Sequence, residues 1–133
     1  MFEVASDAVG SAPGAWALLF AFIIGHMLGD FPLQGDFLAL GKVRGYWIGP
    51  DAPAGASPGM WLYCLTAHSL IQAGIVWIIS GSVILGVAEL VLHWLTDYGK
   101  GEGKFGFALD QGFHLGAKVV FSVMIYLGVI PLI

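Results

Sequence analysis

Long apolar runs, separated by turn-forming residues, divide the chain into four segments. They cover about residues 15–40, 60–79, 83–98 and 107–132. About 20 helical residues cross a hydrocarbon core of roughly 30 Å, and backbone groups that face lipid must be bonded within their own segment. The pattern predicts an all-α fold: a single transmembrane domain, residues 1–133, built as an up-down bundle of four helices.

A proline interrupts the first apolar run. Pro32 lacks a backbone N–H, so the carbonyl of Leu28 loses its helical partner, and we expect a kink between Gly29 and Pro32. The first and second runs are separated by residues 41–59, which contain five glycines and three prolines. Such a composition is typical of a surface loop.

Polar residues recur at four-residue intervals inside the third and fourth runs. The third contains Glu89, His93 and Asp97, and the fourth contains Asp110, His114 and Lys118. Residues four apart share one helix face. If the turn between the runs folds them back on each other, the two faces pair in three layers: Asp97 with Asp110, His93 with His114, and Glu89 with Lys118. We interpret the deepest layer as a buried ion pair, because either charge alone would be uncompensated.

The composition indicates the solvent around these helices. Hydrophobic residues make up 58% of the chain and charged residues 11%, and the mean hydropathy is +0.85. A soluble domain has about 25% charged residues, so we interpret the chain as an integral membrane protein with the lipid bilayer as its surroundings. The net charge is −4, with five basic residues, which argues against nucleic acid as a partner. Cys64 is the single cysteine, so it indicates neither a disulfide nor a metal-ligand spacing.

Charge asymmetry predicts the orientation of the bundle. The loops after the first and third helices contain Lys42, Arg44, Lys100 and Lys104, whereas the amino terminus, the turn at residues 80–82 and the carboxyl terminus contain no lysine or arginine. The positive-inside tendency makes those loops cytoplasmic and puts both termini on the outer side. Each helix then has one histidine at a similar depth in the cytoplasmic leaflet.

Imidazoles and carboxylates at one depth indicate a divalent-metal site. Together they suit zinc, manganese or iron. The predicted ligands are His26, Asp30, His68, His93, Asp97, Asp110 and His114. They exceed what one tetrahedral ion needs, so either two ions bind, or some of these residues orient the ligands or serve as a general base. The alternative is a purely structural polar network between helices.

Four short motifs resemble a family of small bacterial and phage integral membrane proteins known only as a domain of unknown function. They are GHMLGDFPLQGDF, AHSL, LHWLTDYGK and LDQGFH, within a match from about Phe20 to the end. The matching positions are His26, Asp30, Gln34, His68, His93, Asp97, Lys100, Asp110, Gln111 and His114. The resemblance implies a bacterial inner (cytoplasmic) membrane location. Its motif style is similar to that of membrane-bound metal-dependent hydrolases.

An enzyme is the first of three function classes. A metal-dependent hydrolase or transferase would act at the cytoplasmic leaflet on a lipid or phosphoester, such as a phospholipid or a polyprenyl phosphate, with the ion activating water. The base would be Asp30, Asp97 or Asp110, and the substrate head group would be held by Lys100, Gln34 and Gln111.

Two other classes compete with the enzyme. The first is a protein that binds or conducts metal ions or protons through the three layers, although polar residues thin out toward the outer half. The second is a haem protein with paired histidines, which we rank lowest because neighbouring aspartates suit a harder ion. A structural subunit of a larger membrane complex, or a homo-oligomer, also stays open.

Overall fold

The computed structural model describes residues 2–132, and all the regular secondary structure in that range is helical, with no strand. Its long helices are α2 (Ala12–Asp30), α4 (Met60–Ser80), α5 (Val83–Gly101) and α6 (Phe107–Tyr126). Its short elements are α1 (Phe2–Ala8), α3 (Gly35–Gly41) and the 3-10 helix η1 (Arg44–Trp47). The predicted all-α class is confirmed.

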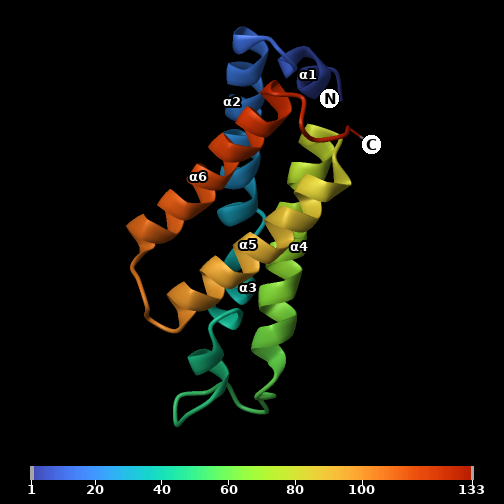
Figure 1. Cartoon of the computed structure of the whole chain (residues 1–133). Coiled ribbons are helices and arrows are strands. Elements are labelled where there is room, and N and C mark those ends of the chain that lie inside the picture. Colours follow the sequence, from blue (N-terminus) through green and yellow to red (C-terminus); the bar gives the residue numbers. More distant parts are fainter. Residues whose placement is uncertain (1, 133) are drawn as a thin grey trace.

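Consecutive long helices run in opposite directions (Figure 1). Both ends of the chain lie beside α1 and the turn between α4 and α5, and we call this the terminal end. The other end, which we call the loop end, holds residues 42–59 and the turn between α5 and α6. In the view of Figure 1, α5 and α6 are inclined to α2 and α4.

The first predicted helix is two helices, because the expected kink is a complete break. α2 ends at Asp30 and α3 begins at Gly35. The N–H of Leu33 bonds to the Leu28 carbonyl at 3.0 Å, so the carbonyl that Pro32 leaves unpaired finds a donor one residue later. Gly35 has a φ of 60°, a left-handed conformation that glycine adopts without steric cost. α2 and α3 are therefore separate helices joined by residues 31–34.

Most of the other predicted boundaries agree to within three residues, and the end of the fourth helix lies six residues earlier than predicted. Gly81 ends α4 with a φ of 66°, as expected for the turn at residues 80–82. α5 continues to Gly101, and α6 stops at Tyr126 rather than at residue 132. The Gly10 N–H bonds to the Tyr126 carbonyl at 2.9 Å, which joins the amino-terminal segment to the end of α6.

Two helices in the described range, α2 and α4, are long and apolar enough to cross a membrane. A buried helix of a soluble protein can pass the same test, so this property by itself is weak evidence. The sequence predicts four spans. α5 and α6 carry buried charged side chains on their inward faces, which lowers their hydropathy.

The terminal end has an apolar core. It is formed by Ala5, Ala8, Leu18, Phe22, Val76, Ile79, Leu85, Phe121 and Ile125. The rings of Phe22 and Phe121 meet edge to face, with 6.4 Å between their centroids. Toward the loop end, the same inward faces become polar, and this change positions the candidate site.

Candidate metal centre

A cluster of buried polar side chains fills the bundle between the apolar core and the loop end. We define the polar cluster as His26, Asp30, Lys42, His68, Gln72, Glu89, His93, Asp97, Lys100, Asp110, Gln111, His114 and Lys118. All seven predicted metal ligands belong to it, and the most exposed of them, Asp30, is 6% accessible. Segments that are far apart in sequence therefore direct their imidazoles and carboxylates into one volume.

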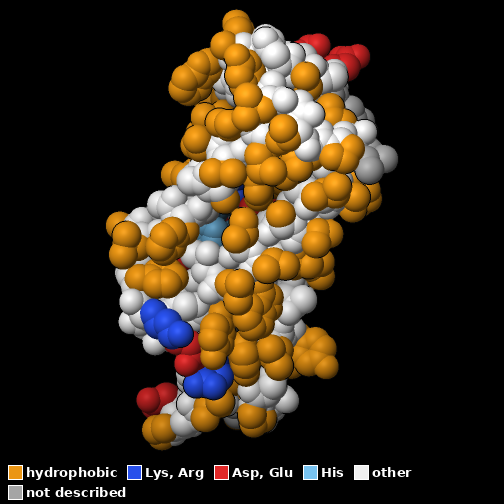
Figure 2. Space-filling view, in the orientation of Figure 1, with side chains coloured by type: hydrophobic (Ala, Val, Ile, Leu, Met, Phe, Trp, Pro, Cys, Tyr) orange, Lys and Arg blue, Asp and Glu red, His pale blue; other side chains and the backbone are white. Residues whose placement is uncertain are grey.

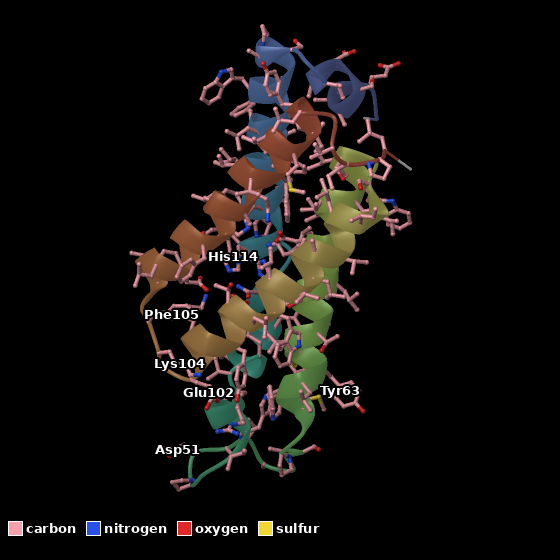
Figure 3. All side chains as sticks on the ribbon, in the orientation of Figure 1. Asp51, Tyr63, Glu102, Lys104, Phe105 and His114 are labelled. Carbon is pink, nitrogen blue, oxygen red and sulfur yellow. The ribbon has the colours of Figure 1, made fainter. Side chains whose placement is uncertain are left out.

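The predicted pairing of α5 with α6 is present in its two deeper layers. Glu89 Oε1 lies 2.5 Å from Lys118 Nζ, and both side chains are 1% exposed, so the predicted buried ion pair is confirmed. The His93 and His114 rings stack with their centroids 3.9 Å apart. Figure 3 shows His114 on the side of α6 that faces α5.

The third layer joins two aspartates through shared partners. His114 Nε2 lies 3.3 Å from Asp97 Oδ1 and 3.4 Å from Asp110 Oδ1. Lys100 Nζ donates to Asp110 Oδ2 at 2.7 Å and lies 3.6 Å from Asp97 Oδ1. Two neighbouring carboxylates would repel each other, so the cationic side chain between them offsets that repulsion.

The spacing of donor atoms around His68 and His93 matches that of metal ligands. Their Nε2 atoms are 3.0 Å apart. Asp30 Oδ1 lies 3.3 Å from His68 Nε2 and 3.6 Å from His93 Nε2, and Asp97 Oδ2 lies at 3.4 and 3.6 Å. Adjacent ligands of a tetrahedral ion with bonds of about 2.0–2.1 Å are about 3.3 Å apart. Each aspartate therefore forms, with the two histidines, a triangle of the size of one face of such a site.

His93 is oriented by a carboxylate. Its Nδ1 lies 3.1 Å from Glu89 Oε1, which accepts the ring proton and leaves the Nε2 lone pair directed at His68 and the aspartates. Metal-binding histidines are usually fixed in this way by a carboxylate or carbonyl on their second nitrogen. Glu89 therefore orients the candidate ligand His93 in addition to pairing with Lys118. The predicted pairing with Lys118 did not indicate this second role.

Asp30 is fixed by two amide side chains. Gln72 Nε2 donates to Asp30 Oδ1 at 2.7 Å, and Gln111 Nε2 donates to Asp30 Oδ2 at 2.8 Å. His26 Nε2 lies 3.1 Å from Gln111 Oε1, an atom that only accepts, so His26 donates its proton there. In this arrangement, His26 orients Gln111 and Asp30. His26 also forms, with Asp30 and His93, a group close enough together to hold an ion, so its predicted role as a ligand stays a prediction.

A glycine provides the room for Gln72. A Cβ at Gly29 would lie 2.5 Å from Gln72 Nε2 and 2.7 Å from its Cδ. Any larger residue at this position would displace the amide from Asp30. Gly29 therefore links the packing of α2 on α4 to the geometry of the cluster.

Lys42 is a cluster residue that the sequence did not identify. It follows α3, is 8% exposed, and donates to Asp97 Oδ2 at 2.6 Å. Trp47 helps to hold this segment, because its Nε1 donates to the Gly41 carbonyl at 2.6 Å. Lys42 joins the cluster because the loop after α3 folds back against α5. Its contact with Asp97 links residues distant in sequence, so spacing along the chain does not predict it.

Gln34, predicted to hold a substrate, makes no hydrogen bond to a side chain of the polar cluster in the described residues. Its Nε2 donates to the backbone carbonyl of Asp30 at 2.8 Å. It therefore closes the end of α2 and supports Asp30 through the main chain. Gln111, predicted for the same role, lies inside the cluster, bonded to His26 and both neighbouring aspartates.

The cluster reaches the surface between α5 and α6. His114 is 3% exposed while the other three histidines are 0% exposed, and the Lys100 side chain is 25% exposed. Figure 2 shows a pale blue histidine surface in a hollow between these two helices. Access from outside therefore leads first to His114 and Lys100.

The carboxylates of the cluster outnumber its ammonium groups, so a bound cation would bring the cluster closer to neutrality. Its ionisable partners are the carboxylates Asp30, Glu89, Asp97 and Asp110 and the ammonium groups Lys42, Lys100 and Lys118. With neutral histidines, four negative charges face three positive ones. The remaining negative charge is costly in a buried site unless a cation or a proton compensates it.

The chain matches no protein-family model, and it has no match among curated proteins or among solved structures. The family resemblance described above therefore stays a prediction. Buried histidine and aspartate groups lie close enough together to hold a metal ion. The function proposed below is argued from this geometry.

Proposed function

We propose that this chain is an integral membrane protein that binds a divalent metal ion in the polar cluster and uses it to hydrolyse a lipid or phosphoester. The convergence of His68, His93, Asp30 and Asp97 within 3.0–3.6 Å of one another, along the five contacts given above, supports the metal site most directly. The donors suit zinc, manganese or iron.

The distribution of exposed side chains supports a membrane location for all four long helices. The outward faces of α5 and α6 are apolar, with Val87, Val91 and Leu95 on one and Phe113 and Val120 on the other. The exposed charged residues in the described range lie outside the four long helices, on α1, on α3 or at the loop end. Figure 2 accordingly shows a broad hydrophobic middle with charges toward its two ends.

The same distribution supports an orientation. Arg44 and Lys104 are exposed at the loop end, whereas the exposed charges of α1 are Glu3 and Asp7. We infer that the loop end is cytoplasmic and that both termini are outside. With the family resemblance, this favours a multi-pass protein of a bacterial inner membrane, with the hollow between α5 and α6 opening toward lipid in the cytoplasmic leaflet.

Each residue of the cluster near the hollow has a proposed role in hydrolysis. A bound ion would act as a Lewis acid toward water and toward the phosphoryl oxygen. A water oxygen attacks phosphorus, the ester P–O bond breaks, and the leaving alkoxide is protonated from solvent. Asp110 accepts the proton of the attacking water, while Lys100 and Gln111 bind the phosphoryl oxygens at the hollow. Asp30 and Asp97, which contact the two central histidines, serve as ligands.

Phosphate release tests this function. The purified protein in lipid nanodiscs, loaded with zinc or manganese, is given phosphatidate and polyprenyl phosphate, which are phosphomonoesters whose hydrolysis releases inorganic phosphate. We expect metal-dependent release that is lost in Asp110→Asn and kept in Gly112→Ala, a glycine of the same helix with open space around it. Metal-loaded protein that releases no phosphate or fatty acid from any of these substrates would contradict the hydrolase.

A metal-free structural or proton-conducting network is the second candidate. One observation favours it: Lys42, Lys100 and Lys118 each contact a carboxylate, so much of the charge is compensated without an ion. Conduction would need a polar path beyond Lys118, whereas the buried residues that follow on α6 are Phe121, Ser122 and Ile125, with a single hydroxyl among them. Proton and metal flux into liposomes separates these possibilities, because a scaffold gives neither flux nor metal content.

A further inference from the structure

We propose that the polar cluster holds two divalent ions that share the carboxylate of Asp97. This inference rests on the proposed function, since it concerns the number of ions in the same cluster. The first position lies between His68 and His93, as described above. The second lies between His114 and Asp110, nearer to the hollow between α5 and α6.

A second triangle of donor atoms defines the second position. His114 Nε2 is 3.3 Å from Asp97 Oδ1 and 3.4 Å from Asp110 Oδ1, and these three residues can direct one atom each to a common ion. The other Asp97 oxygen, Oδ2, faces His68 and His93 at 3.4 and 3.6 Å. One carboxylate thus presents one oxygen to each position, which is how a carboxylate bridges a pair of ions.

An unpaired buried oxygen supports the second position independently. Asp110 is fully buried, and its Oδ1 has no hydrogen-bond partner in the described part of the chain. Its other oxygen is satisfied by Lys100. Leaving a buried carboxylate oxygen unpaired is costly, and an ion between Asp110 and His114 would remove that cost. Asp110 would then be a ligand of this ion instead of the general base, and the ion itself would acidify the attacking water.

The two positions differ in how complete their ligand sets are. The first is approached by four protein donors, from His68, His93, Asp30 and Asp97, around two histidines that are 0% exposed. The second has three donors and lies beside Lys100, whose side chain is 25% exposed. Structural zinc sites have four protein ligands, whereas catalytic ones have three and keep a position for water or substrate. The second position is therefore the one that substrate reaches.

Charge predicts the conditions under which the second ion binds. With its histidines neutral, as metal ligands are, the cluster has one excess negative charge, so one divalent ion makes it positive by one and two ions make it positive by three. An oxyanion at the hollow offsets this excess and also bonds to Lys100. We therefore expect phosphate, as a product or substrate analogue, to strengthen binding of the second ion.

Manganese stoichiometry tests the inference. Chelator-treated protein in nanodiscs is titrated with Mn²⁺, with and without inorganic phosphate, and followed by calorimetry and by electron paramagnetic resonance. We expect two equivalents per chain in the presence of phosphate, an exchange-coupled signal from neighbouring ions, and at least tenfold weaker binding of the second equivalent without phosphate.

Matched variants assign the two positions. His114→Ala and the isosteric Asp110→Asn should each retain one equivalent and give an uncoupled signal, while Gly112→Ala keeps both ions because a Cβ there meets nothing within 4 Å. His68→Ala should lose the first position. Circular dichroism verifies that each variant is folded.

The outcomes separate the two proposals. A single equivalent in the parent protein that is lost in His68→Ala and unchanged in Asp110→Asn would overturn the second ion and leave the proposed metal site intact. Two equivalents without exchange coupling would overturn the shared Asp97 carboxylate. Failure of the parent protein to bind any Mn²⁺ or Zn²⁺ would instead remove the proposed function itself.

Discussion

The two halves of the bundle use the same helices for opposite purposes. At the terminal end, their inward faces form an apolar core around Leu18, Phe22 and Phe121. Toward the loop end, the same faces bury histidine, aspartate and lysine side chains. One half resembles the interior of an ordinary helical bundle, and the other concentrates groups that are costly to bury.

The change between the halves occurs along single helix faces. On α2, the buried positions at four-residue intervals are Leu18, Phe22, His26 and Asp30, and on α5 they are Leu85, Glu89, His93 and Asp97. The four-residue interval itself is maintained by packing. The polar cluster therefore differs from the apolar core in the residue types at equivalent buried positions, and both are built on the same helices. Substitutions can alter each half separately.

Breaking the ion pair at the boundary should have the largest effect. Glu89→Ala leaves Lys118 charged and unpaired in a site that is 1% exposed. We expect a loss of about 3–5 kcal/mol in the free energy of unfolding, as for other broken buried pairs, measured by denaturant unfolding in detergent micelles.

The matched control removes both charges. Glu89→Met with Lys118→Met replaces the pair by apolar side chains and should recover most of the stability lost in the single variant. A double variant as unstable as Glu89→Ala would contradict the interpretation that the unpaired charge causes the loss.

Removal of His93 should have the next largest effect, on metal affinity. Its Nε2 contacts His68, Asp30 and Asp97, so His93→Ala removes the central donor of the first position. We expect the affinity for Zn²⁺ to fall by at least about 100-fold, or about 2.7 kcal/mol, in a competition assay with a chelating dye. Unchanged affinity would show that the ion binds elsewhere.

A cavity in the apolar half should affect stability alone. Leu18→Ala removes a fully buried side chain from the terminal-end core. We expect a cost of about 2 kcal/mol, at the low end for Leu→Ala, because in the proposed membrane location the surrounding lipid would be as apolar as the lost contacts. Unfolding and zinc titration of the same sample test this, and a large loss of zinc affinity would mean that the two halves are coupled.

The smallest expected effect, that of Gly29→Ala on zinc affinity, tests whether helix packing controls the geometry of the metal ligands. Gly29→Ala should push Gln72 away from Asp30 and weaken zinc binding about tenfold, the lower range for lost outer partners of metal ligands. Gly112→Ala, in open space, should leave zinc affinity unchanged and slightly favour the helix. Equal affinities in the two variants would show that Gln72 does not position Asp30.

The fold was predictable where the signal is local. Runs of apolar residues and the turn at Gly81 gave the four long helices, and Pro32 gave the end of α2. The apolar runs predict four spans, whereas a hydropathy average counts both faces of each helix. The charged inner faces of α5 and α6 lower that average, so two helices of the described range, α2 and α4, satisfy the composition of a membrane span.

The candidate site was predictable where spacing determines the geometry. The four-residue intervals place Glu89 against Lys118 and His93 against His114 without further information. Lys42 and Gln72 could not be recognised in the same way. Lys42 reaches Asp97 only because the loop after α3 returns to the bundle, and Gln72 reaches Asp30 only because Gly29 leaves room.

Zinc-edge X-ray absorption on the metal-loaded protein tests the central claim most directly. A shared site predicts mixed nitrogen and oxygen scatterers at about 2.0–2.1 Å with the outer-shell pattern of imidazole, and a large loss of that pattern in His93→Ala. A spectrum with oxygen scatterers only, or one unchanged in His93→Ala, would contradict metal binding by the clustered histidines.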